Sequence, residues 1–137
     1  MAEHAGFRFW KPLIWDKVSI GMGYHYRARY EFVLFFEKGK RRLSDLGVAG
    51  VITARRATNG YPTQKPTEVT DILVGQSSDP GDLVVDPFMG AGTTGVSAVT
   101  QGRRFWGSDV AAEALRLTRE RLERDAHPSV TRVSLAI

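Results

Sequence analysis

The residues best placed to do chemistry lie in one short stretch, Asp-Pro-Phe-Met-Gly-Ala-Gly-Thr-Thr-Gly, at residues 86–95. This stretch contains the pattern G-x-G-x-x-G and directly follows an apolar run. Gly90 and Gly92 let the backbone approach a ligand closely, and the absence of a side chain at Gly95 lets a helix pack on a strand. The pattern therefore predicts a ligand-binding turn between a strand and a helix.

Two carboxylates beside this turn restrict the kind of ligand. Asp86 stands at the end of the apolar run, and Asp109 follows Gly90 at a spacing suited to an acid that binds ribose hydroxyls. Each acid also has a simpler interpretation. Asp86 can be a turn residue at a strand end, and Asp109 can cap the helix that follows it.

Three classes of nucleotide ligand compete for the turn. A phosphate-binding P-loop ends in Gly-Lys-Ser/Thr, but Val96 follows Gly95, so this class is excluded. A nicotinamide dinucleotide is compatible with Asp109, but Asp86 would then lie near the two negative charges of the pyrophosphate, which lowers affinity. S-adenosylmethionine would instead place positive charge near Asp86, because its methionine end carries an ammonium and its sulfonium is positive. The charges therefore favour S-adenosylmethionine.

Alternating helices and strands surround the turn from Pro66 onward. Val69, Ile72 and Leu73 stand at helical spacing and predict a helix with Thr67 as its N-cap. Further along the chain we expect strands at residues 83–88, 103–109 and 131–137 and helices at residues 93–101 and 110–125. This order predicts a parallel sheet covered on both faces, a Rossmann-like α/β layout.

The first third of the chain has the pattern of antiparallel β structure. An apolar run at residues 12–18 and an aromatic, β-branched run at residues 30–38 predict two strands joined by a glycine-bearing loop. Together they form a β-hairpin with a long loop. A short third strand is expected at residues 50–52.

Composition limits the class of protein. The 137 residues are enough for one domain with a core, and 42% hydrophobic with 25% charged residues is typical of globular chains. There is no cysteine, which excludes disulfides and thiolate metal sites, and we expect no metal. No apolar run approaches the ~20 residues of a membrane span, and the N-terminus lacks the apolar core of a secretory signal. We therefore expect a cytoplasmic chain with no membrane partner.

Residues that could contact a nucleic acid lie mainly in the first half of the chain. The net charge is +4, and basic residues cluster between residues 38 and 56. A solvated loop and a phosphate-binding surface are both compatible with this cluster. The aromatic residues Trp15, Tyr24 and Tyr26 are able to stack on a base, but we expect them to pack in a core, the commoner role of such residues.

Together these elements make the sequence resemble the amino-group DNA methyltransferases, which methylate the exocyclic nitrogen of adenine or cytosine. Residues 86–95 match the cofactor loop of that family, "YPTQKP" at residues 61–66 matches its PTQKP element, and residues 102–122 match its adjoining strand and helix. The first third also resembles the strand hairpin that precedes these elements in the subgroup with a C-terminal cofactor half. The matching elements stand in the family's order.

The resemblance implies a fold and a cofactor. The fold is a single α/β domain, an incomplete Rossmann-like methyltransferase sheet with flanking helices plus an N-terminal β-hairpin. The hairpin region spans residues 1–40, a loop spans residues 41–60, and the S-adenosylmethionine-binding region spans residues 61–137. Lys65 is expected near the methionine end of S-adenosylmethionine, and Asp109 at the ribose. The other expected cofactor-binding residues are Asp86, Pro87, Phe88, Gly90, Gly92 and Thr93. DNA is the expected partner of Lys40, Arg41, Arg42, Arg55 and Arg56.

The resemblance also reveals what this sequence lacks. The family holds the target amine with Asp, Asn or Ser followed by Pro-Pro and an aromatic residue, but no two of the six prolines here are adjacent. We therefore assign no catalytic residue. In the family's sheet, the strand with that tetrapeptide and the next strand lie between the cofactor strand and the hairpin. The strand at residues 83–88 is thus expected to have an unpaired edge, and we expect a second protein chain, a catalytic partner or another copy, to fill the gap.

Three functions are compatible with these features. The first is the S-adenosylmethionine-binding part of a DNA amino-methyltransferase that needs a partner chain for the catalytic motif. The second is a catalytically inactive regulator or remnant that keeps cofactor or DNA binding. The third is an NAD-binding domain.

Overall fold

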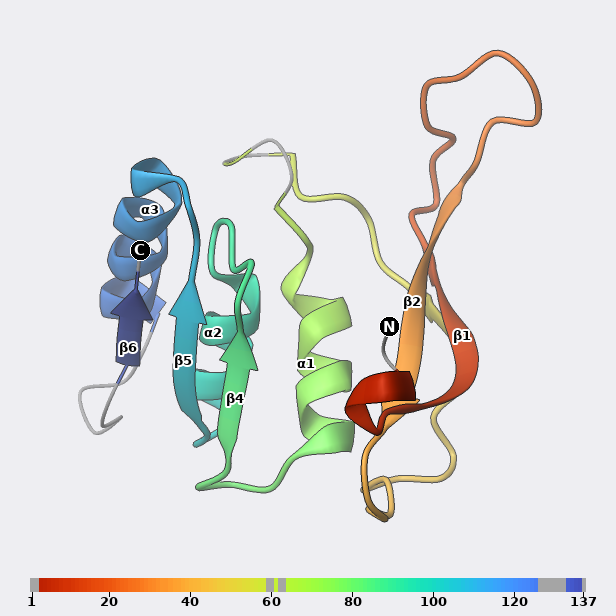
Figure 1. Ribbon diagram of the computed structural model, residues 1–137. Coiled ribbons are helices and arrows are strands. Elements are labelled where there is room, and N and C mark those ends of the chain that lie inside the picture. The colour runs from red at the N-terminus through yellow and green to blue at the C-terminus, as the bar shows by residue number, and fades with distance from the viewer. Residues whose placement is uncertain (1–2, 59–60, 62–63, 126–132, 137) are drawn as a thin grey trace. The chain divides into compact units, whose positions relative to one another are not determined.

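The structure is a computed structural model of the chain, and it describes residues 3–58, 61, 64–125 and 133–136. The chain divides into two compact units, Met1–Arg55 and Arg56–Ile137. Each unit has its own three-stranded sheet (Figure 1). A short 3₁₀ helix, η1 (Glu3–Ala5), precedes the first sheet.

The first unit contains the predicted β-hairpin. β1 (Arg8–Asp16) pairs antiparallel with β2 (Tyr30–Glu37), and β3 (Val51–Thr53) pairs parallel with the end of β1. β1 begins earlier than the predicted residue 12 and includes Pro12. Since β3 pairs only with residues 14–16, Pro12 lies where β1 has a partner on one side only, the setting in which a strand tolerates proline.

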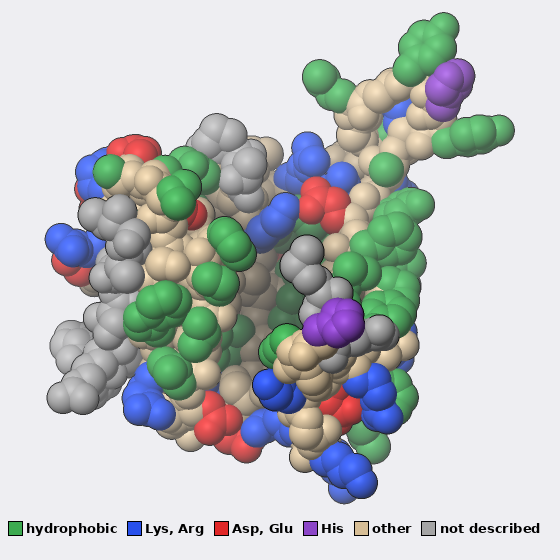
Figure 2. Space-filling view, in the orientation of Figure 1, with side chains coloured by type: hydrophobic (Ala, Val, Ile, Leu, Met, Phe, Trp, Pro, Cys, Tyr) green, Lys and Arg blue, Asp and Glu red, His purple; other side chains and the backbone are tan. Residues whose placement is uncertain are grey.

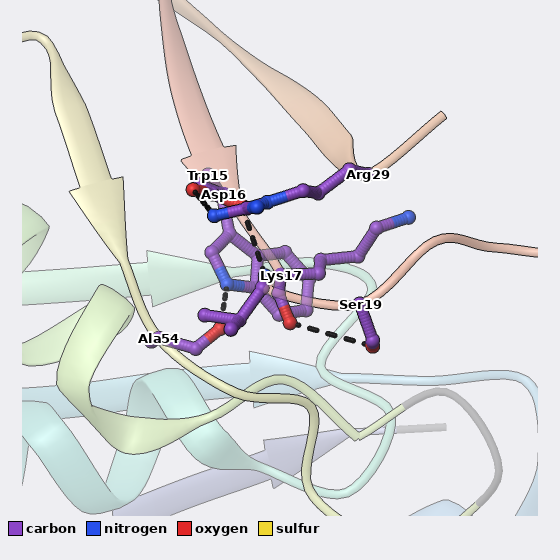
Figure 3. Close-up of polar contacts among 7 residues, drawn as sticks. Trp15, Asp16, Lys17, Ser19, Arg29 and Ala54 are labelled. Atoms are coloured by element: carbon purple, nitrogen blue, oxygen red, sulfur yellow. Dashed lines mark hydrogen bonds and ion pairs between the residues drawn. The ribbon is translucent and has the colours of Figure 1, made fainter. Parts of the chain in front are cut away.

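Buried side chains hold the end of the hairpin in place. Trp15 and Ile52 are buried, and the indole Nε1 of Trp15 donates a hydrogen bond to the backbone oxygen of Ala54 at 2.8 Å (Figure 3). Lys17 is also buried, and its Nζ lies 3.5 Å from Oε1 of Glu31. The prediction that Trp15 packs in a core is therefore confirmed.

The second unit alternates helices and strands, as predicted. Its three strands are parallel and lie side by side in the order β4-β5-β6. The elements in chain order are α1 (Thr67–Ser77), β4 (Leu83–Asp86), α2 (Thr93–Thr100), β5 (Arg104–Ser108), α3 (Ala112–Asp125) and β6 (Val133–Ala136). This is the Rossmann-like α/β layout expected from the sequence.

The start of α1 differs from the prediction. The N-cap is Pro66, not Thr67, and no side chain caps the helix. Pro66 has φ −67° and ψ 141°, an extended conformation that its ring favours, and Thr67 is already helical. The Thr67 carbonyl oxygen accepts a hydrogen bond from Oγ1 of Thr70 at 3.1 Å.

The core of the second unit lies between the sheet and its helices. α2 packs on β4 and β5 and also contacts α1 and α3. Phe105 of β5 is almost completely buried and belongs to one cluster with Val99 of α2 and Leu122 of α3. Ala114, Thr118 and Leu122 are buried along α3 and form the inward face of that helix.

The helices cover only one face of this sheet in the described residues, so the prediction of two covered faces is wrong for them. The strand order advances in one direction, and right-handed crossovers through α2 and α3 therefore fall on the same side. Along β4, Val84 is partly buried against the core, whereas Leu83 and Val85 are 51% and 53% exposed. Figure 2 shows hydrophobic side chains gathered over the open face of the sheet.

β4 forms an edge of this sheet in the part of the chain that the structure describes. It pairs with β5 and with no other described strand. The unpaired edge predicted from the sequence is therefore present. Such an edge presents free backbone N–H and C=O groups to any strand that approaches it.

Candidate functional site

The glycine turn connects the end of β4 to the start of α2. Gly90 and Gly92 have φ +51° and +71°, left-handed values that glycine adopts without strain. The amide of Gly92 donates to the Met89 oxygen at 2.8 Å, and the amide of Val96 donates to the Gly92 oxygen at 3.0 Å. The turn therefore reverses the chain over a few residues and sets the first amides of α2 at the end of the strand.

The three glycines of the pattern have different physical roles. A Cβ on Gly95 would lie 2.7 Å from the Phe105 ring, which confirms that this glycine lets α2 pack on β5. A Cβ on Gly92 would lie 2.5 Å from Cγ2 of Thr118, so packing against α3 requires this glycine. A Cβ on Gly90 would meet its nearest atom only at 4.0 Å. Gly90 is thus the glycine with open space beside its backbone.

A cavity of about 220 Å³ lies beside the turn. Three segments of the second unit form its wall, namely the residues just before α1, the first turn of α1, and the stretch from the end of β4 through the first turn of α2. The lining residues are Gln64, Lys65, Thr70, Asp86, Phe88, Met89, Gly90, Ala91, Thr93 and Thr94.

The structure brings most of the predicted cofactor-binding residues together at this cavity. Those that line it are Lys65, Asp86, Phe88, Gly90 and Thr93, and those that do not are Pro87, Gly92 and Asp109. The lining residues that sequence reasoning missed are Gln64, Thr70, Met89, Ala91 and Thr94. Four of these stand within the quoted motifs, but Thr70 is revealed only by packing, since its Oγ1 lies 2.6 Å from Oγ of Ser97 on α2.

Lys65 and Thr93 join two walls of the cavity. Oγ1 of Thr93, the first residue of α2, donates to the backbone oxygen of Lys65 at 3.1 Å. Thr93 is buried and Lys65 is exposed. The hydrogen bond holds the segment before α1 against the N-terminus of α2.

Asp86 and Phe88 lie at the strand end on another wall. Oδ1 of Asp86 accepts a hydrogen bond from the Phe88 amide at 3.1 Å, so Asp86 is a turn-stabilising acid as well as a lining residue. The two interpretations of Asp86 from the sequence are therefore compatible. Phe88 is 86% exposed and presents an apolar ring at the cavity.

Asp109 ties the glycine turn to the start of α3. Its Oδ2 accepts from the Gly90 amide and its Oδ1 from the Ala111 amide, both at 2.9 Å. The hydrogen bonds from these amides, first Ala111 and then Gly90, lower the pKa of Asp109 below its ordinary value. The bond to Ala111, just before α3, fits the helix-start interpretation. The bond to Gly90 was not foreseen from the sequence.

The basic residues predicted to contact DNA are all exposed. Most of them belong to the first unit, and Arg56 belongs to the second. Exposure fits a solvated loop and a phosphate-binding surface equally. These residues are Lys40, Arg41, Arg42, Arg55 and Arg56.

The loop between β1 and β2 carries exposed aromatic side chains. Tyr24 and Tyr26 are fully exposed, so the prediction that they pack in a core is wrong. Below them, Nε and Nη2 of Arg29 each donate to a carboxylate oxygen of Asp16 at 2.7 Å (Figure 3). This ion pair, led by the hydrogen bond from Arg29, lowers the pKa of Asp16 to about 2. The base of the loop is therefore fixed while its end is open to solvent.

Metal sites and membrane helices are both absent from the described residues. No cluster of three or more His, Asp or Glu side chains in that part of the chain could hold a metal ion. None of the helices described there combines the length and the apolar sequence needed to span a bilayer.

Comparison with known proteins gives one family. The family model described as "DNA methylase", for N6 and N4 methyltransferases, matches residues 1–120. The type II methyltransferase M2.DpnII of Streptococcus pneumoniae is 33% identical over 116 residues, which are 84% of this chain and 42% of that protein. The DNA adenine methyltransferase YhdJ of Escherichia coli is 41% identical over 69 residues, which are 50% of this chain and 24% of that protein.

A similar solved structure extends the likeness to three dimensions. The M1.HpyAVI–SAM complex superposes with a TM-score of 0.74 at 27% identity, covering 88% of this chain and 65% of that one. This chain therefore spans less than two thirds of the proteins that it resembles.

Proposed function

The chain belongs to the N6/N4 DNA methylase family, and we propose that it binds S-adenosylmethionine for methyl transfer to the exocyclic amine of adenine or cytosine in DNA. A similar structure in this family was solved with S-adenosylmethionine. Membership favours this methyl donor over the nicotinamide alternative. A DNA substrate would place the protein in the cytoplasm.

The observation that carries the proposal is the cavity beside the glycine turn. It gathers a cation at Lys65, an anion at Asp86 and an aromatic ring at Phe88 around the open backbone of Gly90. A zwitterionic amino acid end of a ligand needs both charges, and a positive sulfonium favours the carboxylate and the ring. The charges and the aromatic ring of this cavity therefore fit S-adenosylmethionine.

Five of the predicted residues have a proposed role here in holding the cofactor. Asp86 accepts from its ammonium, and Lys65 stands near its carboxylate. Thr93 and Gly90 shape the wall between them. Asp109 reaches the ribose hydroxyls with the acceptor capacity that remains after its two amide bonds, since a carboxylate can accept about four. When bound, S-adenosylmethionine supplies an electrophilic methyl group.

A second protein chain is proposed to supply the catalytic tetrapeptide. No pair of adjacent prolines occurs in these 137 residues. In the described structure, the edge of β4 can pair with an additional strand, and the apolar face with Leu83 and Val85 can take an element packed on it. A catalytic partner or another copy that adds strands at the edge and packs on the face would cover both. Val85 and Leu83 would then change from exposed to buried.

DNA is proposed to contact the first unit. Its basic residues Lys40, Arg41 and Arg42 are exposed, and the loop with Tyr24 and Tyr26 presents aromatic rings to solvent. Cations pair with phosphates, and exposed aromatic rings stack on unpaired bases. Figure 2 shows hydrophobic side chains and a histidine at the end of this loop.

The second candidate function, an inactive regulator that keeps cofactor or DNA binding, is supported by the same lack of the tetrapeptide. Transfer of a labelled methyl group from S-adenosylmethionine to DNA separates the two functions. The proposal expects no transfer by this chain alone and transfer once a chain carrying the tetrapeptide is added. Transfer by the purified chain alone would show that it contains catalytic residues of its own. Cofactor binding without transfer in every mixture would favour the regulator.

A further inference from the structure

We propose that Arg121 of α3 is a positioning residue that fixes the glycine turn through hydrogen bonds to Ala91 and Thr93, without lining the cofactor cavity itself. Arg121 does not line that cavity, and although it stands in the stretch 102–122 that resembles the family's adjoining strand and helix, the sequence assigned it no role. The inference rests on the proposed function, because it assumes that the cavity binds S-adenosylmethionine. Its physical basis, the contacts of Arg121 with the turn, is independent of the ligand.

Arg121 contacts two residues that do line the cavity. Its Nη1 donates to the backbone oxygen of Ala91 at 2.5 Å and lies 3.1 Å from Oγ1 of Thr93. Thr93 links Arg121 to the segment before α1, because the same Oγ1 donates to the backbone oxygen of Lys65 at 3.1 Å. One guanidinium therefore connects α3 to both walls of the cavity.

Neighbouring groups complete the support of the turn. Oγ1 of Thr118, on the same helix, donates to the Gly90 oxygen at 3.0 Å, and Asp109 accepts from the Gly90 amide at 2.9 Å. Successive polar groups of the turn are thus bonded to side chains from α3 and from the connection that precedes it. A turn with left-handed glycines has no regular backbone ladder, so side-chain partners satisfy polar groups of the turn that its few backbone hydrogen bonds leave over.

The surroundings of Arg121 make its hydrogen bonds strong. Its guanidinium is partly buried, and burial lowers the pKa of Arg121 while leaving it charged at any working pH. Its hydrogen bonds are therefore charge-assisted. A second cavity of about 210 Å³ adjoins it, and Leu117, Glu120 and Arg124 of the same helix also line this cavity.

The other arginines of α3 differ from Arg121 and supply a control. Arg116 pairs with Glu113 and Glu120, and Arg124 pairs with Asp125 on the helix surface. Arg119 is exposed. Arg119→Met therefore makes the same chemical change on the same helix away from the turn.

The test combines calorimetry with S-adenosylmethionine and amide spectra of the ¹⁵N-glycine-labelled, ligand-free protein. Arg121→Met should shift the amide resonances of Gly90 and Gly92 and raise the Kd about tenfold, the effect of losing one charge-assisted hydrogen bond. Arg121→Lys, which keeps a donor, should restore most of the affinity. Arg119→Met should change neither readout.

Unchanged Gly90 and Gly92 resonances together with an unchanged Kd in Arg121→Met would overturn the inference. If the wild-type chain itself binds no S-adenosylmethionine, the proposed function fails, while the glycine resonances still decide whether Arg121 sets the turn. If Arg121→Met does not fold, Arg121→Gln is measured in the same way, because glutamine is too short to reach both acceptors. Arg121→Gln should also shift the Gly90 and Gly92 resonances and raise the Kd. The absence of both effects counts against the inference.

Discussion

The three glycines of the motif at residues 86–95 have different physical roles. Gly95 makes room for Phe105 and Gly92 for Thr118, whereas Gly90 has open space beside it. The motif pattern predicted the packing role of Gly95 but assigned Gly92 to ligand approach, because Thr118, which Gly92 packs against, stands far along the chain. Spacing within a motif therefore predicts the turn better than the role of each glycine.

We expect Gly92→Ala to destabilise the protein more than Gly81→Ala. Both glycines have a positive φ, which costs alanine about 1–2 kcal/mol. Only Gly92 has a neighbour within 4 Å, and overlap with Thr118 adds about 1–3 kcal/mol. Chemical denaturation of the two variants measures the difference in unfolding free energy. Equal losses would show that α3 does not require this glycine.

Asp109 should make the stability depend on pH through its depressed pKa. A carboxylate with a lowered folded pKa stabilises above its unfolded value of about 3.9 and loses that contribution as the pH falls toward the folded value. The difference in unfolding free energy between wild type and Asp109→Asn should therefore shrink from about pH 5 to about pH 3. A difference that stays constant over this window would contradict the amide contacts of Asp109.

At the scale of elements, the sequence predicted every helix and strand of the second unit, because its apolar runs and glycine stops are strong local signals. It could not predict that Pro66 rather than Thr67 caps α1, since both residue types are common at helix starts. It also placed Tyr24 and Tyr26 in a core, because aromatic residues usually are buried. Their exposure depends on how the loop leaves the hairpin, which no local pattern encodes.

The loop between β1 and β2 should depend on the ion pair at its base. In Arg29→Gln, the pKa of Asp16 should rise from about 2 toward the ordinary value of about 3.9, because its main hydrogen-bond donor is removed. Carboxyl carbon resonances followed through a pH titration measure this change. The control is Arg27→Gln, since Arg27 bonds to the Gly21 oxygen and not to Asp16. A pKa that remains near 2 in Arg29→Gln would contradict the pairing.

At the scale of the whole molecule, the sheet that the structure describes in the second unit has one face covered by helices, one open face and an unpaired edge at β4. The unpaired edge followed from the missing family strands, but the open face did not, because strand order rather than local pattern decides on which side the helices fall. The family match spans residues 1–120, while the chain covers 42% of a relative such as M2.DpnII. Completion of the sheet by a further chain is the simplest proposal for these surfaces.

DNA binding should be electrostatic and involve the basic residues of the first unit. Replacing Lys40, Arg41 and Arg42 together by glutamine should weaken binding and reduce the slope of log K against log salt by about 0.9 for each phosphate that is no longer neutralised. Fluorescence anisotropy with duplex DNA over a range of salt concentrations measures the slope. Arg119→Gln should leave it unchanged. An unaltered slope in the triple variant would favour the solvated-loop interpretation.

The most direct test of the cofactor site is a titration of the ¹⁵N-glycine-labelled protein with S-adenosylmethionine. We expect the Gly90 amide, at the cavity wall, to shift in proportion to occupancy, while the amides of Gly6 and Gly39 in the first unit do not. A saturating titration that leaves the Gly90 resonance in place, or one in which NAD moves it and S-adenosylmethionine does not, would contradict S-adenosylmethionine binding at this turn.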